Sequence, residues 1–204
     1  ELTVLKKREH VDIATLFVAN KELIFPSLFY VSGLIIGAIL YTVLEQGTFK
    51  ELIEQIAQGC TTDFLTLFLN KTAIYLSVYT VCVLLGLCLI GFPFINIIPL
   101  LCGVEIALKL AYYYVNFDVK GVGYSLLIIA PGAVGFVTIL VFTIKLSNTL
   151  SKTIYYLTTN KADTIQEVNL KSYLLRFLLY SLIVLAIAAL SALVTHLLSS
   201  IIVL

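Results

Sequence analysis

Long hydrophobic runs, each approaching 20 residues, dominate this sequence. About 20 apolar residues in a helix span the roughly 30 Å hydrocarbon core of a membrane, whereas the strands of a membrane barrel would appear as short alternating segments. Of the 204 residues, 60% are hydrophobic and only 12% are charged, which would leave a soluble globule with too much exposed apolar surface. The sequence therefore predicts an all-α, polytopic integral membrane protein with a single domain.

The runs predict about five membrane spans, separated by polar or proline-containing segments. These spans cover residues 24–44, 72–92, 93–115, 122–142 and 174–204. Three segments lie outside them: an amphipathic N-terminal segment (1–23), an amphipathic outer loop (45–71) and a basic loop (145–173). Within the outer loop, residues 64–69 are too short to cross a membrane and are expected to lie along its surface.

The distribution of Lys and Arg predicts the orientation of the chain in a bacterial cell membrane. Nine of these residues lie on the side of the N-terminus and three on the other side, and cytoplasmic segments carry the excess of positive charge. The nine are Lys6, Lys7, Arg8, Lys21, Lys145, Lys152, Lys161, Lys171 and Arg176, and the three are Lys50, Lys71 and Lys120. We therefore expect a cytoplasmic N-terminus and an extracytoplasmic C-terminus.

Prolines and glycines punctuate the predicted spans. Because proline has no backbone N–H, Pro93, Pro99 and Pro131 are expected to break the third and fourth spans at points that neighbouring helices shield. In the first span, Gly33 and Gly37 have the small-xxx-small spacing that lets two membrane helices approach closely.

An opposite-charge pair, Glu105 and Lys109, lies within the third span. The spacing of four residues places both side chains on one helix face, where they can pair. Near the middle of a membrane each charge alone would cost about 2.5–3.5 kcal/mol, so the pair is expected to face protein or a wet cavity. The alternative is that both side chains reach the membrane surface, with Tyr112, Tyr113 and Tyr114 as an aromatic anchor.

Motifs typical of enzymes, metal sites and cofactor sites are missing from the sequence. His10 and His196 have no nearby partner, and the four cysteines follow no metal-ligand spacing. No phosphate loop, dinucleotide-binding glycine pattern or nucleophile elbow occurs, and no basic run of the kind that binds nucleic acid. We therefore expect a protein without catalysis, metal or cofactor, in which Cys60, Cys82, Cys88 and Cys102 serve as packing residues.

Short glycine and proline motifs give the chain a resemblance to one family. They are Gly91-Phe92-Pro93, Gly103 at the start of the third span, the Gly121/Gly123 link and Ile129-Ala130-Pro131. Their order, from about Phe25 to the C-terminus, resembles that of the stage II sporulation protein M family of integral membrane proteins. The chain departs from the family at Cys102, where an arginine is common, and at Gly132 and Ala133, where polar residues are frequent.

The resemblance implies a non-enzymatic membrane scaffold. Sporulation members of the family anchor two peptidoglycan-degrading partners during engulfment of the forespore. Related members act as accessory proteins in circular-bacteriocin production and immunity, often beside an ABC transporter. The leading expectation is a scaffold that docks wall hydrolases or other membrane proteins in the lipid bilayer, with homo-oligomerisation left open. The alternative is a transporter or an export or immunity subunit, because proline-broken spans with a charge pair build binding sites in transporters.

Overall fold

The computed structural model describes residues 13–44, 63–89, 91–159 and 170–199, and in these residues all regular structure is helical. The elements are α1 (Ile13–Leu44), α3 (Phe64–Leu87), α4 (Gly91–Ile95), α5 (Ile97–Tyr124), the π-helix η1 (Ser125–Ile129), α6 (Ala130–Thr158) and α7 (Leu170–Ser199). The prediction of an all-α fold is confirmed. Four stretches are long and apolar enough to cross a membrane: Lys21–Val43, Phe64–Leu87, Gly91–Tyr156 and Lys171–Leu198.

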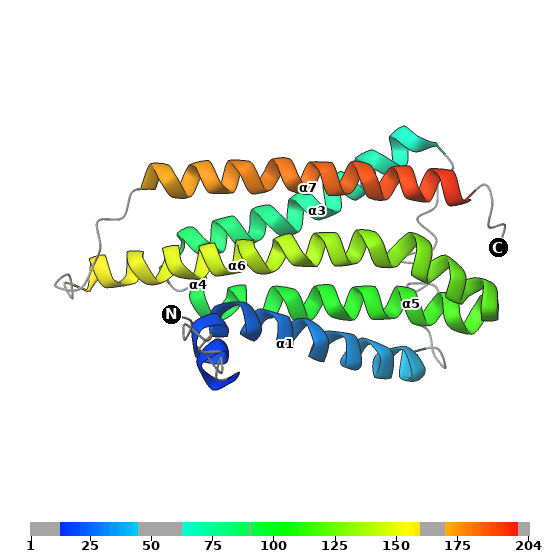
Figure 1. The fold of residues 1–204 in the computed structure, drawn as a ribbon, viewed down its shortest axis with the longest axis horizontal. Coiled ribbons are helices and arrows are strands. Elements are labelled where there is room, and N and C mark those ends of the chain that lie inside the picture. The colour runs from blue at the N-terminus through cyan, green and yellow to red at the C-terminus, as the bar shows by residue number, and fades with distance from the viewer. Residues whose placement is uncertain (1–12, 45–62, 90, 160–169, 200–204) are drawn as a thin grey trace, which may run out of the picture.

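The long helices form an elongated bundle (Figure 1). The chain runs along the first part of α5, reverses at the Asp118 kink and returns through the end of α5, η1 and α6. The beginning of α1 and the end of α7 lie at opposite ends of the bundle (Figure 1). α1 packs mainly against α5, whereas α3 packs against α6 and α7. The bundle therefore consists of an α1–α5 pair and an α3–α6–α7 group.

Each of these two parts has its own buried cluster. Tyr79, Phe136, Leu140, Ile144 and Val184 belong to the cluster formed largely by α3, α6 and α7. The second cluster joins α1, α5 and η1 and is rich in tyrosine; it consists of Tyr41, Leu108, Tyr112, Tyr113, Tyr124 and Ile128. Many other large apolar side chains point outward, as expected for helices that face lipid.

Glycines allow the close contact between α1 and α5. A Cβ atom on Gly33 would overlap the backbone of Leu100, and a Cβ on Gly103 would overlap the backbone oxygen of Tyr30. A Cβ on Gly37 would come within 2.7 Å of the Cβ of Ala107. The structure therefore places Gly33, Gly37 and Gly103 at a single helix–helix contact.

The helices extend beyond the predicted spans. Residues 64–69, expected to lie separately along the surface, form the first turns of α3, which ends at Leu87 instead of residue 92. The basic loop expected over 145–173 is much shorter, because α6 continues to Thr158 and α7 begins at Leu170. Residues 13–23 of the N-terminal segment belong to α1, whereas 1–12 and 45–62 lie outside the described residues.

The breaks predicted at the prolines are not confirmed. The chain leaves α3 at Cys88, whose ψ of 139° is extended, five positions before Pro93 in α4. Pro99 lies buried in the first turn of α5, where a missing N–H is tolerated. Pro131 opens α6 directly after the π-helix η1, so the chain stays helical there. The sharp kink is at Asp118, which has a positive φ of 46°.

Candidate functional site

A cavity of about 500 Å³ lies between α3, α5, η1, α6 and α7. This volume falls within the roughly 300–1,000 Å³ that small-molecule sites occupy. Its walls are mainly apolar, with Ile74, Val78, Ile106 and Phe136 among them. The polar lining residues are Asn70, Lys71, Tyr75, Glu105, Lys109, Tyr113, Tyr124, Ser191 and Thr195.

The charge pair of α5 lies on the cavity wall. Lys109 Nζ donates a hydrogen bond of 2.6 Å to Glu105 Oε1, across one helical turn. The Glu105 side chain is 39% exposed and the Lys109 side chain 26% exposed, so neither is fully buried. Both lie near the middle of the part of α5 that precedes the Asp118 kink. The pair therefore faces a cavity, one of the two environments that the sequence left open.

The tyrosines that follow the pair do not form a common surface anchor. Tyr112 and Tyr113 are buried in the cluster with Tyr41, and their rings meet edge to face. Tyr114 alone among the three is exposed. The expected anchor of three tyrosines is thus reduced to one side chain, because α1 and η1 cover the other two.

Lys71, which the sequence predicts in the outer loop, forms a second charged wall of the cavity. Its ammonium donates to the backbone oxygen of Ser191 at 3.0 Å, to Ser191 Oγ at 2.8 Å and to Thr195 Oγ1 at 2.6 Å. Ser191 and Thr195 are buried and lie one turn apart on α7. The i, i+4 pair of hydroxyls within an apolar run was the only sequence signal for this contact.

Close packing brings α7 to the cavity. A Cβ atom on Gly132 of α6 would overlap Ser191 Oγ, so glycine lets the hydroxyl approach Lys71. On the same wall the ring of Tyr75 stacks on Phe136, with a centroid distance of 4.2 Å and an interplanar angle of 11°. The departure from the resembled family at Gly132 thus has a local packing reason.

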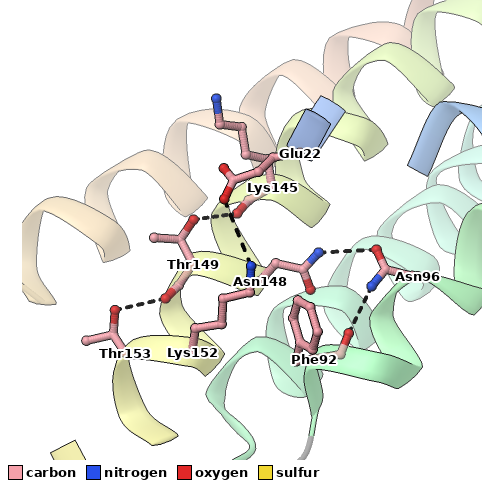
Figure 2. Close-up of polar contacts among 8 residues, drawn as sticks. All are labelled: Glu22, Phe92, Asn96, Lys145, Asn148, Thr149, Lys152 and Thr153. Carbon is pink, nitrogen blue, oxygen red and sulfur yellow. Dashed lines mark hydrogen bonds and ion pairs between the residues drawn. The ribbon is translucent and has the colours of Figure 1, made fainter. Parts of the chain in front are cut away.

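A second polar cluster lies where α4 meets α6, as Figure 2 shows. Asn148 Nδ2 donates to Asn96 Oδ1 at 3.2 Å, and Asn96 Nδ2 donates to the backbone oxygen of Phe92 at 3.0 Å. Lys152 Nζ lies 4.0 Å from Glu22 Oε1 and 4.5 Å from the centre of the Phe92 ring. These contacts connect α4 to α6 and α1. The cluster therefore has a structural role beside the interruption between helices α3 and α4.

Ser151 adds a tie between α6 and the end of α3. Its Oγ donates to the backbone oxygen of Cys88 at 2.8 Å, and the same oxygen accepts from the backbone N–H of Gly91 at 3.2 Å. Gly86 lies against Ser147 at the same contact. The break between α3 and α4 therefore has polar partners within the bundle.

The candidate residues from the sequence fall into three places. Glu105 and Lys109 line the cavity, whereas Gly33, Gly37 and Gly103 lie at the α1–α5 contact. None of the three prolines is a lining residue of the cavity: Pro93 and Pro131 are exposed, and Pro99 is buried at the start of α5. Sequence reasoning thus identified the charge pair of the cavity lining and did not identify Lys71, Ser191 and Thr195.

Cysteine and histidine occupy the positions of packing and surface residues in the described helices. Cys82 and Cys102 are buried, Cys88 is exposed, and Cys60 lies outside the described residues. His196 is exposed and meets the Phe64 ring edge-on at 5.9 Å. Within the described ranges, no group of three His, Cys, Asp or Glu side chains is placed to hold a metal ion.

Comparison with protein-family models, with curated proteins and with solved structures finds no match to this chain. The resemblance to the stage II sporulation protein M family therefore stays a prediction. The cavity is the feature from which a function can be argued.

Proposed function

We propose that this chain is a non-enzymatic, multi-pass protein of the bacterial cell membrane that binds a polar group of another molecule beside Glu105 and Lys109, as transport and export-accessory proteins do. The supporting observation is the 2.6 Å ion pair on the wall of a cavity of about 500 Å³. Charges inside a membrane protein are costly, and those that line a cavity typically mark the path or site of a ligand.

The proposal includes a topology with five crossings. The stretch Gly91–Tyr156 contains 66 residues, and as one straight helix it would be about 100 Å long, far beyond the ~30 Å of a hydrocarbon core. The chain reverses at the Asp118 kink within α5, which divides this stretch into two passes (Figure 1). With a cytoplasmic N-terminus, the cavity then lies in the outer half of the membrane, since it is lined by the early part of α3 and the late part of α7.

A photo-crosslinking experiment tests whether the cavity binds a ligand. A benzoyl-phenylalanine replaces Ile106 on the cavity wall or, as a control, the exposed Val134 of α6, which is not a lining residue. We expect Ile106 to capture one compound of discrete mass, and Glu105→Gln to reduce that adduct at least several-fold. Val134 should capture a mixture of bulk lipids with or without the Glu105 change. Identical lipid mixtures at both positions would contradict the proposal.

A scaffold for wall hydrolases or another membrane protein, as the resemblance implies, is the second candidate. It is favoured by the exposure of Glu105, whose side chain is accessible enough to meet a polar residue of a partner helix. In the same experiment this candidate predicts that Ile106 captures a protein, detected as a discrete shift in mass on a denaturing gel. The two functions thus give different adducts at one position.

A further inference from the structure

We infer, on the basis of the proposed function, that the cavity selects a zwitterionic group: a ligand that carries an ammonium and an acidic group, either as the head of a lipid or as a free small molecule. The inference rests on three features of the cavity: hydrogen-bonding capacity that the ion pair does not use, the balance of charge on α5, and the apolar walls around it.

The Glu105–Lys109 pair leaves both partners partly unused. Its single hydrogen bond of 2.6 Å occupies one carboxylate oxygen, Oε1, and one of the three N–H groups of the ammonium. Among the described residues, no further hydrogen bond reaches Glu105 Oε2 or the other two N–H groups of Lys109. Since both side chains are partly exposed along the cavity, a ligand can donate to Oε2 and accept from Lys109 together.

Charge balance favours a ligand that has both signs. The pair on α5 has no net charge. A ligand that carried only one charge would therefore be attracted by one of these two side chains and repelled by the other. An ammonium beside Glu105 and an acidic group beside Lys109 would each meet the opposite charge, which offsets the cost of placing them in apolar surroundings. The ammonium of Lys71 also lines the cavity, on the α3 side, where its hydrogen bonds to Ser191 and Thr195 direct it toward α7.

The remaining walls suit an apolar chain attached to such a head. Ile74, Val78 and Ile106 line the cavity together with the stacked rings of Tyr75 and Phe136. Sites of this kind bury most of a ligand against apolar side chains and use a few polar groups to orient it. A phosphatidylethanolamine head has the required ammonium and acidic group, and so does free glycerophosphoethanolamine, which has the same phosphodiester.

The test measures equilibrium binding to the full chain, purified in a maltoside detergent. Three probes are compared: dihexanoyl-phosphatidylethanolamine, the anionic dihexanoyl-phosphatidylglycerol, and free glycerophosphoethanolamine. We expect the zwitterionic lipid to bind about tenfold more tightly than the anionic one, and Glu105→Gln and Lys109→Gln each to weaken its binding about tenfold. Lys152→Gln, which changes a cation outside the cavity, should leave binding unchanged.

A variant with the pair reversed, Glu105→Lys with Lys109→Glu, guards against loss of folding. It keeps both charges on the same wall and should restore binding of the zwitterionic lipid. If free glycerophosphoethanolamine binds as tightly as the lipid, the ligand is a small soluble zwitterion. If the lipid binds and free glycerophosphoethanolamine does not, the ligand is a lipid. Equal binding of the anionic lipid, no binding of either zwitterion, or binding that neither single variant weakens would overturn the inference. A discrete adduct at Ile106 would still support the proposed function in that case.

Discussion

Glu105 and Lys109 are the charged residues whose surroundings matter most for the function of this chain. They pair within one helix, and their side chains are 39% and 26% exposed beside a cavity. Exposed pairs contribute only about 0–1 kcal/mol, whereas breaking a buried pair costs about 3–5 kcal/mol because one charge is left uncompensated. The environment of this pair lies between those limits.

A double-mutant cycle measures that environment. We expect Glu105→Ala and Lys109→Ala each to lower the free energy of unfolding in detergent by about 1–3 kcal/mol, between the exposed and buried limits. The double variant should cost less than the two single changes together, because it leaves no lone charge. Chemical denaturation followed by circular dichroism gives the values. Additive changes close to zero would mean that water surrounds both groups and that the cavity does not confine them.

The charged lining was only partly predictable from the sequence. The Glu105–Lys109 pair follows from a spacing of four residues, which any helix converts into a contact. Lys71, in contrast, contacts Ser191 and Thr195, which lie at least 120 positions away along the chain. Local periodicity carries no information about such a contact, and a lysine before a long apolar run has the pattern of a helix end.

At the scale of elements, the α1–α5 pair is held by close backbone approach. Gly33 and Gly103 each lie against backbone atoms of the opposite helix, so no flexible side chain can move aside to admit a methyl group. Gly123 also lies in a helix, but a Cβ atom there would meet nothing within 4 Å beyond its own stretch of helix. This glycine therefore provides a matched control.

Gly33→Ala should lower the free energy of unfolding by about 1–3 kcal/mol, the usual cost of overpacking a close contact. Gly123→Ala should be neutral or slightly stabilising, because alanine is the better helix former. Thermal unfolding of both variants in the same detergent compares them directly. Equal midpoints for the two variants would contradict the close α1–α5 contact.

Helix type was predictable from the sequence, and helix ends were not. Apolar runs of about 20 residues identify membrane helices because the thickness of the bilayer sets their length. The ends were misplaced where polar residues continue a helix: Lys71 lies within α3, and Lys145 and Lys152 lie within α6. In α6 the hydroxyls of Thr149 and Thr153 donate to backbone oxygens one turn earlier, so the polar part stays helical (Figure 2).

At the scale of the whole molecule, positive charge lies mainly toward the end where α1 and α7 begin. Lys21, Lys152, Lys171 and Arg176 are on this side, and Lys152 approaches Glu22 of α1. Toward the opposite end are Lys120 beside the Asp118 kink and Lys71 in the early part of α3. The arrangement of the helices therefore separates the charges in the way that the positive-inside rule associates with a cytoplasmic N-terminus.

Cysteine labelling in intact Gram-positive cells tests both this orientation and the five crossings. Cys82 and Cys102 are buried, so only Cys60 and Cys88 need replacement by serine, and that parent is the unlabelled control. A membrane-impermeant maleimide should label Lys120→Cys in intact cells, because Lys120 lies at the turn between the outward pass of α5 and the returning α6. It should label Lys21→Cys and Lys171→Cys only after permeabilisation, because neither residue lies at that turn. Labelling of all three positions from one side would exclude two passes by the stretch Gly91–Tyr156. The reverse pattern would place the cavity in the cytoplasmic half of the membrane, and a zwitterionic ligand would then have to enter from the cell interior.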